Sequence, residues 1–296
     1  MHIPVLLKET LEFLDLKPGK FIIDGTVDGG GHSSEIIKKI GPNGKLLGLD
    51  WDKDMMSLAL KNLGKLAKEN KVELILVNKN YAELRDVLKN KNLGLADGLL
   101  LDLGFSSLHI ESSGRGFSFL RNEPLIMTYN DNSLPAYEFL KRAQFDELSN
   151  ILKDYGEERY AVQIAKKILE KRRTKKIENT FDLVEIIKEA VPSKYLHQKI
   201  HPATKTFQAL RIYLNKELEN LKKVLSEIKN IVLPGGRIVI ISFHSLEDRI
   251  VKNFFKEMSK NKKLEILTKK PITPKYEEIK NNPKSRSAKL RSAIIL

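Results

Sequence analysis

Short apolar segments alternate with amphipathic segments along the first hundred residues. Between the apolar segments, residues 33–40 and 54–69 carry apolar side chains at helical spacing. The apolar segments have the length of buried strands and read KFIID (20–24), KLLGLD (45–50), VELILV (72–77) and ADGLLLD (96–102). This alternation predicts an α/β fold with a parallel, doubly wound sheet.

The alternation stops after residue 108. From 109 to 205 the apolar spacing is helical, and no segment has the pattern of a buried strand. We therefore predict a discontinuous core, residues 1–108 and 206–296, interrupted by an all-helical insert at 109–205.

Strand patterns return near the end of the chain. A long helical pattern at 207–229 precedes an apolar segment at 236–243, and two more strand-like segments follow at 264–268 and 289–296. The last two are close in sequence, so we expect them to form an antiparallel pair at the edge of the sheet.

The composition is that of a soluble globular protein and excludes several kinds of site. The 296 residues are 41% hydrophobic and 30% charged, as in a soluble globular protein, and the net charge of +14 favours a polyanionic partner. Cysteine is absent, which excludes disulfides and cysteine-based zinc sites. The first 20 residues resemble a short amphipathic helix and no apolar run could span a bilayer, so we expect a cytoplasmic protein without membrane contact.

Acidic residues follow three of the predicted strands. Asp24, Asp50 and Asp102 each end one of them, and Asp28 lies in the glycine-rich stretch FIIDGTVDGGGHSSEI (21–36). Ligands of open parallel sheets bind at the carboxyl ends of the strands. Four acidic side chains at this edge constrain the charge of the ligand, because carboxylates attract cations and repel anions.

The acids favour a cationic cofactor over a dinucleotide. The G-x-G-x-x-G fingerprint fails at Ser34, and Asp28 would repel a pyrophosphate, so an NAD-dependent oxidoreductase is disfavoured. S-adenosylmethionine carries a sulfonium and no phosphate. Asp50 could accept its ribose hydroxyls, while Gly30 and Gly31 allow close backbone approach. Asp28 could equally be a turn residue in the left-handed conformation.

The segment DLGFSS (102–107) follows the fourth strand, where an amino-group methyltransferase would place its target base. Methyl transfer to an exocyclic amine needs in-line alignment and an acceptor for an N–H. Asp102 or a neighbouring backbone carbonyl could be that acceptor. Alternatively, Asp102 caps the following turn.

Two other sites are disfavoured. His197 and His201 have the spacing of metal ligands on a helix, but Pro202 follows and no H-E-x-x-H pattern is present, so we predict no metal. The segment ISFHSLEDR (241–249) contains serine and histidine without the G-x-S-x-G turn of a hydrolase, and we interpret it as a loop after a strand.

Several segments resemble one family, the ribosomal RNA small subunit methyltransferase H family. They are HIPVLL (2–7), DGT and GGH within 24–32, LLLDLGFSS (99–107), RGFSF (115–119), YGEER (155–159), HPATKTFQALRIYLN (201–215), LPGGR (233–237), ISFHSLEDRIVK (241–252) and NPKSRSAKLR (282–291). They occur in the family's order over nearly the whole chain. The resemblance implies a class I S-adenosylmethionine-dependent methyltransferase fold, Rossmann-like with an antiparallel last strand, that methylates N4 of a cytidine in the decoding region of 16S rRNA.

The resemblance also implies cofactor-binding positions. They are Gly30, Gly31, His32, Asp50, Tyr81, Asp102 and His109. Asp50 would hold the ribose, Tyr81 would lie beside the adenine, and Asp102 would also position the base. His109 stands where the family usually has Gln.

Other positions depart from the family. Asp28 replaces a glycine, and Ile126, Thr128 and Asn130 replace two acids and an arginine. These replacements are the basis of an alternative hypothesis, an RNA-binding ribosome-assembly factor with reduced or altered methylation activity.

The expected partner is 16S rRNA in the small ribosomal subunit. Basic residues concentrate in the predicted insert and where it rejoins the core: Lys141, Arg142, Arg159, Lys166, Lys167, Lys171, Arg172, Arg173, Lys175, Lys176, Lys205 and Arg211. We expect these to bind rRNA phosphates while the cytosine is turned into the pocket. The oligomeric state stays open, a homodimer being one option.

Overall fold

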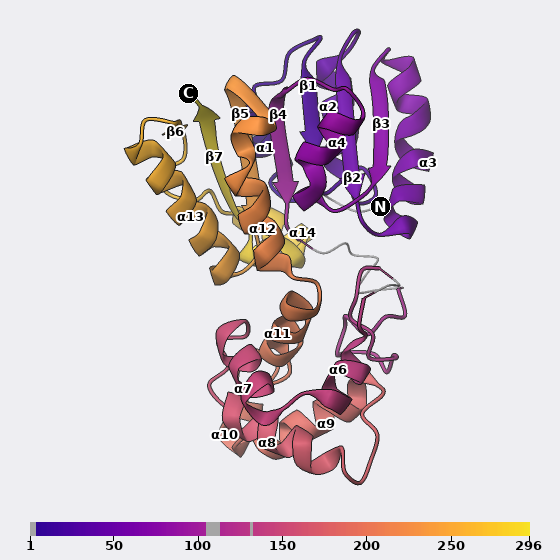
Figure 1. The fold of residues 1–296 in the computed structure, drawn as a ribbon, viewed down its shortest axis with the longest axis vertical. Helices are drawn as coiled ribbons and strands as arrows, with labels where there is room; N and C mark the ends of the chain where they lie inside the picture. Colours follow the sequence, from indigo (N-terminus) through magenta and orange to yellow (C-terminus); the bar gives the residue numbers. More distant parts are fainter. Residues whose placement is uncertain (1–3, 105–112, 131–132) are drawn as a thin grey trace. The chain divides into compact units, whose positions relative to one another are not determined.

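The chain folds into two compact units. The computed structural model describes residues 4–104, 113–130 and 133–296 (Figure 1). The first unit comprises Met1–Gly104 and Leu218–Leu296, and the second comprises Phe105–Glu217. The second unit is therefore longer at both ends than the insert expected at 109–205.

The first unit is built on a seven-stranded sheet. Its strands are β1 (Phe21–Asp24), β2 (Lys45–Asp50), β3 (Glu73–Asn78), β4 (Ala96–Asp102), β5 (Val232–Ser242), β6 (Leu264–Ile266) and β7 (Lys289–Ile295). Their order is β3-β2-β1-β4-β5-β7-β6. β1 to β5 are parallel, and β7 is antiparallel to both of its neighbours. The seven predicted strands and the antiparallel last strand are confirmed, and the topology is that of a class I methyltransferase.

Helices cover both faces of this sheet. On one face, α1 (Leu7–Leu14), α2 (Gly31–Ile40) and α3 (Lys53–Glu69) pack over strand residues such as Ile22 and Leu46. On the other face, α4 (Leu84–Asn90), α12 (Glu217–Ser226) and α13 (Ser245–Lys260) pack over Ile23 and Leu47. Successive strand residues thus enter opposite cores, because side chains alternate along a strand. The short elements are η1 (Tyr81–Glu83), η2 (Ile228–Asn230), η3 (Pro283–Ser287) and α14 (Tyr276–Asn281).

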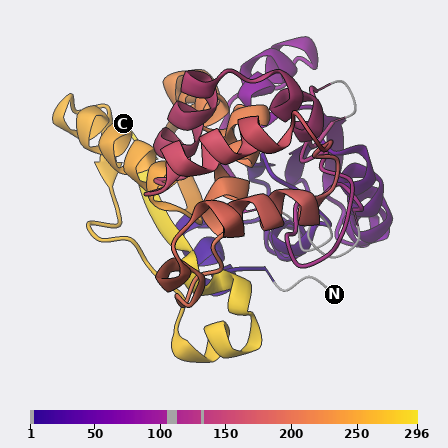
Figure 2. The same cartoon turned by 90° about the horizontal axis from the view of Figure 1, so that it is seen from below.

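The second unit has a helical core of its own. Its helices are α6 (Ala136–Arg142), α7 (Phe145–Asp154), α8 (Ala161–Lys171), α9 (Thr180–Ala190), α10 (Ser193–Leu196) and α11 (Thr204–Leu214). α7 packs against α8 and α11, and α8 packs against α9. Figure 2 shows these helices from below, in magenta to brown. Across the described parts of both units, no helix is long and apolar enough to cross a membrane.

The prediction of one continuous helix at 207–229 is wrong. The structure has two helices there, α11 and α12, separated at Asn215 and Lys216, and Lys216 has a positive φ of 51°. α11 belongs to the second unit, although the sequence pattern placed it in the core. The chain therefore leaves the second unit at a break in a helical pattern.

Candidate functional site

Three carboxylates meet at one edge of the sheet. Asp24, Asp50 and Asp102 end β1, β2 and β4, which are adjacent parallel strands. The order of the strands reverses between β1 and β4, so this edge is the topological switch point where ligands of such sheets bind. The strand assignments made from sequence brought these three residues together.

The loop between β1 and α2 has a tight, partly left-handed backbone. Asp28 has φ 46° and Gly30 has φ 86°. A Cβ on Gly30 would lie 2.8 Å from Leu63 side-chain atoms, so both its conformation and its packing require glycine. The glycine-like backbone expected for Asp28 is confirmed.

Asp50 is fixed by the loops on either side of it. Its Oδ2 accepts the Asp28 N–H at 3.0 Å, and its Oδ1 accepts the Asp52 N–H at 2.9 Å. The backbone carbonyl of Asp50 accepts from the side-chain amide of Asn78 at 2.9 Å. Each carboxylate oxygen has a second lone pair, so a carboxylate held in this way can still accept a ligand hydroxyl.

Asp24 stabilises the loop between β1 and α2 by hydrogen bonds. It is buried, and it accepts hydrogen bonds from the Ser33 hydroxyl at 2.7 Å and the Thr26 N–H at 3.2 Å. Burial raises the pKa of its carboxyl, while the Ser33 hydrogen bond opposes that rise. Asp24 is thus a structural acid of the loop.

Asp102 and His32 form a buried pair. His32 Nδ1 lies 3.5 Å from Asp102 Oδ2, and His32 Nε2 lies 2.9 Å from the carbonyl oxygen of Val5. Burial raises the pKa of Asp102 to about 7, the Gly104 N–H opposes this rise and the charge of Glu247 adds to it. Within the described part of the chain, Asp102 Oδ1 is buried and has no hydrogen-bond partner.

The site carries negative potential. Partial burial and the charges of Asp50 and Asp102 raise the pKa of Asp28 well above its ordinary value. Among the residues the structure describes, no Lys or Arg forms an ion pair with Asp24, Asp28 or Asp102. Such a pocket stabilises a cation and opposes a pyrophosphate.

Comparisons with known proteins agree with this geometry. The model of the MraW methylase family matches residues 1–295. The chain belongs to the MraW methylase family. It is therefore an S-adenosylmethionine-dependent methyltransferase, and the dinucleotide alternative is wrong.

Curated relatives cover almost the whole chain. "Ribosomal RNA small subunit methyltransferase H" of Dictyoglomus thermophilum is 48% identical over 98% of this chain and 95% of its own length. The proteins of the same name from Sulfurihydrogenibium sp. and Clostridioides difficile are 47% and 42% identical, over 98% and 99% of this chain and 97% and 98% of their own lengths.

The residues at the switch point suit the cofactor of this MraW family member. Its sulfonium is a cation, and the carboxylates at the strand ends offer it a favourable potential. Gly30 leaves the loop without a side chain where a Cβ would collide with Leu63. Tyr81 begins η1, three residues after the end of β3, and its Cβ lies 3.2 Å from the position that a Cβ on Gly25 would take. His109, the last predicted contact, lies outside the described residues.

One pair of residues at the end of β5 was missed by the sequence interpretation. His244 Nδ1 caps α13 by accepting the Glu247 N–H, and Glu247 Oε2 accepts the Phe243 N–H at 2.8 Å. His244 Nε2 lies 3.2 Å from Glu247 Oε1, and Glu247 is almost fully buried. The spacing of His244 and Glu247 in HSLE is that of a capping box, which could have located the start of α13.

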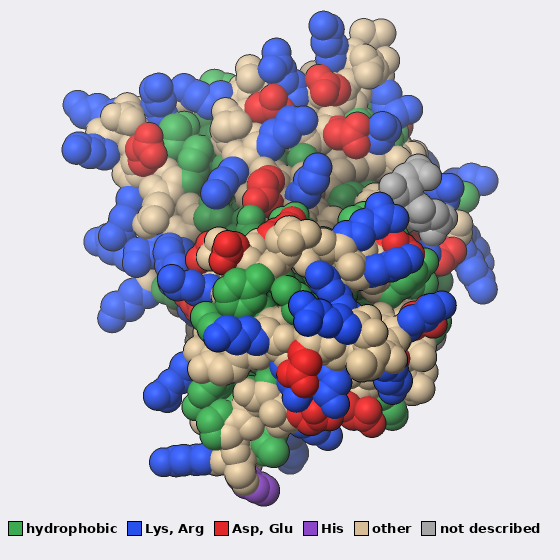
Figure 3. Space-filling view, turned by 60° about the horizontal axis from the view of Figure 1, so that its bottom comes forward, with side chains coloured by type: hydrophobic (Ala, Val, Ile, Leu, Met, Phe, Trp, Pro, Cys, Tyr) green, Lys and Arg blue, Asp and Glu red, His purple; other side chains and the backbone are tan. Residues whose placement is uncertain are grey.

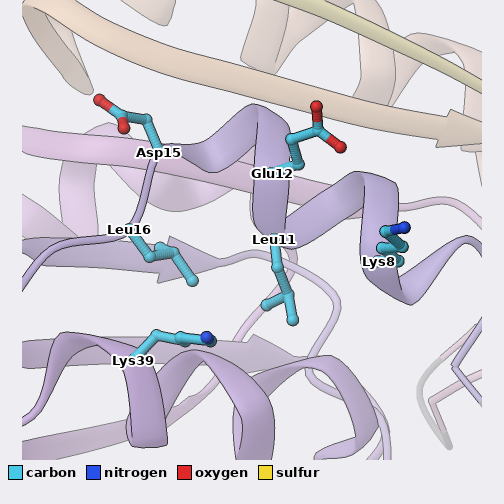
Figure 4. A pocket seen from close by; sticks show the side chains of 6 residues that line it. All are labelled: Lys8, Leu11, Glu12, Asp15, Leu16 and Lys39. Atoms are coloured by element: carbon cyan, nitrogen blue, oxygen red, sulfur yellow. The ribbon is translucent and has the colours of Figure 1, made fainter.

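A cavity of about 390 Å³ lies elsewhere in the first unit of this methyltransferase. Figure 4 shows Leu11 and Leu16 of the α1 region pointing toward α2, from which Lys39 extends. Lys39 is in the last turn of α2, whereas His32 is in its first turn. The cavity is therefore remote from the strand-end carboxylates.

Proposed function

We propose that this methyltransferase methylates N4 of a cytidine in the decoding region of 16S rRNA. Its relatives bear the name of a small-subunit rRNA methyltransferase, and the sequence resemblance to that family extends over nearly the whole chain. The observation that carries the chemical part is Asp102 Oδ1, a carboxyl oxygen at the switch-point edge of the sheet that has no hydrogen-bond partner among the described residues. An exocyclic amine is a donor that this oxygen could accept.

The proposed reaction divides the work among few residues. When bound, S-adenosylmethionine supplies a methyl group and leaves as a neutral thioether with the electron pair of the broken S–C bond. Asp50 would hold the ribose hydroxyls, and Tyr81 would lie beside the adenine. Asp102 Oδ1 accepts an N–H of the exocyclic amine, which orients the nitrogen lone pair. After the N–C bond forms, the cationic nitrogen loses its proton to Oδ1.

The helical unit is the proposed rRNA-binding part, and the structure sorts its basic residues. The Arg211 guanidinium donates two hydrogen bonds to the Glu217 carboxylate, from Nε at 2.9 Å and from Nη2 at 3.0 Å. Arg172 donates to the carbonyl oxygens of Leu140 and Ala143. Both therefore have structural partners, and we drop them from the phosphate-binding set.

Other basic residues of this unit remain candidates for phosphate contacts. Lys166 and Arg173 are exposed and, within the described residues, have no acidic partner. Lys and Arg side chains are spread over much of the face in Figure 3, and acidic side chains are fewer there. Exposed cations of this kind could neutralise RNA phosphates.

Methyl transfer to purified small-subunit particles tests the proposal. The particles come from cells that lack this gene, the cofactor carries a labelled methyl group, and mass spectrometry locates the labelled nucleoside. We expect label on N4 of one cytidine. Label on another base or atom would contradict the proposed specificity.

The same experiment separates the alternative. Binding of the particles without methyl transfer, under conditions where S-adenosylmethionine binds, would favour the assembly-factor hypothesis. The observation that keeps this hypothesis open is the replacement of charged family residues at Ile126, Thr128 and Asn130. Thr128 is buried in the structure, so it offers no group to RNA.

A further inference from the structure

We infer that the His32 imidazole is a positioning group for Asp102: it presents an unprotonated Nδ1 to Asp102 Oδ2, which leaves Oδ1 as the oxygen that faces the substrate amine. This inference rests on the proposed role of Asp102 as the acceptor of the amine N–H. The observations that carry it are the two contacts of the His32 ring and Asp102 Oδ1, which has no hydrogen-bond partner in the described part of the chain.

The Val5 carbonyl decides the tautomer of His32. A carbonyl oxygen only accepts hydrogen bonds, so Nε2 must carry the proton that it donates across 2.9 Å. In a neutral imidazole the other nitrogen, Nδ1, then has a lone pair and no proton. Burial lowers the pKa of His32, which favours this neutral form.

Charges near His32 are of one sign. The carboxylates of Asp24 at the end of β1 and Glu278 on α14 both raise its pKa, and burial outweighs them. The Leu6 N–H donates to Glu278 Oε1 at 2.7 Å, which keeps this acid close to the segment that carries Val5. The ring is therefore held between backbone and acids, and neither nitrogen is directed away from the protein.

The unprotonated Nδ1 acts on Asp102 in two ways. Toward a carboxylate, it places a lone pair against the lone pairs of Oδ2 at 3.5 Å, which destabilises the charged form. Toward a carboxylic acid, it accepts the Oδ2–H. Both effects increase the proton affinity of Asp102, in the same direction as its burial and the charge of Glu247.

The orientation of the carboxyl group follows from its neighbours. The Asp102 N–H donates to the Thr26 hydroxyl at 2.7 Å, which fixes the backbone, and His32 occupies the Oδ2 side. Among the residues that the structure describes, none forms a hydrogen bond with Oδ1, which is a buried acceptor. In this arrangement Oδ2 faces the imidazole of His32, and Oδ1 accepts the hydrogen bond from the substrate amine.

His32→Gln is the discriminating variant. A glutamine can still donate to the Val5 carbonyl from the position of Nε2, but it offers nothing at the position of Nδ1. We expect kcat to fall by about 10- to 100-fold, the usual cost of losing a group that orients an active-site residue. The dissociation constant of S-adenosylmethionine, measured by calorimetry, should stay within about threefold, since no ring nitrogen is available to the cofactor.

The pH profile gives a readout that a structural role would not move. In the wild type, kcat should fall as the pH drops through about 7, because the acid form of Asp102 cannot take a proton from the substrate. In His32→Gln this midpoint should move to lower pH. An unmoved midpoint, or a cofactor affinity that falls as much as kcat, would overturn the inference.

Nitrogen NMR of the histidine rings tests the arrangement without any substrate. The wild-type spectrum should show His32 as the Nε2–H tautomer, assigned by its loss in His32→Gln, with an Nδ1 shift that titrates and stops titrating in Asp102→Ala. An Nδ1–H tautomer or a titration that persists in Asp102→Ala would contradict the inference. Wild-type enzyme that binds cofactor but does not methylate cytidine would refute the proposed function alone, since the NMR and calorimetric results still stand.

Discussion

Single residues at the switch point have separate tasks that only their contacts reveal. Asp24 and Asp50 are both strand-end acids, yet Asp24 is bound by its own loop while Asp50 is fixed by backbone N–H groups on two sides. Their different surroundings suit Asp50 to bind a ligand hydroxyl and Asp24 to hold the loop.

Replacing Asp50 by alanine should weaken S-adenosylmethionine binding by about 10- to 100-fold. A hydrogen bond to a charged group contributes about 1.5–3 kcal/mol, and the ribose would lose its acceptor. Isothermal titration measures the change, and Asp86→Ala, an exposed acid on α4, is the matched control. An unchanged dissociation constant in a folded Asp50→Ala protein would exclude the ribose role.

Asp28 should show opposite effects on stability and on binding. Its folded-state pKa is raised, so its contribution to stability is greatest at acidic pH and is lost as the pH rises and the carboxyl ionises. Asp28→Asn should therefore unfold at a higher temperature than the wild type, by a margin that grows above a pH of about 4. Its affinity for the cationic cofactor should fall, because a negative charge is removed.

Asp28→Gly separates charge from backbone strain. Glycine also relieves the left-handed conformation at φ 46°, which costs an L-residue about 1 kcal/mol, so this variant should be more stable than Asp28→Asn. Thermal unfolding of both variants across pH checks the order. Equal stability of the two would contradict this order.

At the scale of elements, local pattern predicts strands better than it predicts where a helix ends. The strand segments are short, apolar and bounded by turn residues, so their carboxyl-terminal acids were located from sequence. The break between α11 and α12 was not, because residues 207–229 keep apolar side chains at helical spacing throughout. Tertiary hydrogen bonds at Asn215, which no local pattern encodes, compete with helix continuation there.

Asn215 makes the contacts that hold this break. Its Nδ2 donates to the carbonyl oxygens of Met127 and Arg211, at 2.8 Å and 2.9 Å, and its Oδ1 accepts the Tyr129 N–H at 3.1 Å. Met127 has a positive φ of 59°, a backbone conformation that is unfavourable for a residue with a side chain. The hydrogen bond from Asn215 to the Met127 carbonyl helps to hold this conformation. Asn215 therefore contacts the family-divergent segment 126–130 through its backbone, at Met127 and Tyr129.

Asn215→Ala should destabilise the second unit by about 2–3 kcal/mol. Buried carbonyl and N–H groups would lose their partner, at about 1–3 kcal/mol for the groups left unsatisfied. Chemical denaturation measures the loss, with Asn150→Ala on the exposed side of α7 as the control. A loss as small as that of the control would mean that α11 and α12 are separated by other contacts.

In the candidate site, too, the local sequence pattern predicts the strand ends but not the tertiary contacts. Sequence alone located Asp24, Asp50 and Asp102 at one edge, because parallel strands end together. The family resemblance assigned His32 to the cofactor, and this stays a prediction; the structure shows in addition that both ring nitrogens face Val5 and Asp102. Val5 precedes α1, far from the strand ends in sequence, and a backbone carbonyl has no sequence signature.

For the whole molecule, the excess of positive charge predicts how RNA affinity depends on salt. Cations that neutralise phosphates release counterions, and each such contact adds about 0.7–0.9 to the slope of log affinity against log salt concentration. Of the cations on the helical unit, those already paired with acids, such as Lys175 with Asp182, should contribute less than Lys166 and Arg173.

Replacing Lys166 and Arg173 together by glutamine should reduce that slope by about 1.4–1.8 if each contacts one phosphate. Fluorescence anisotropy with a decoding-region RNA at several salt concentrations measures it. The matched control is Lys61→Gln with Lys68→Gln on α3, exposed lysines that lower the net charge equally but belong to the sheet unit. A smaller slope in both double variants would show that only the total charge matters. A smaller slope in the first alone supports the helical unit as the part that binds RNA, because the two proteins then differ only in where the charge was lost.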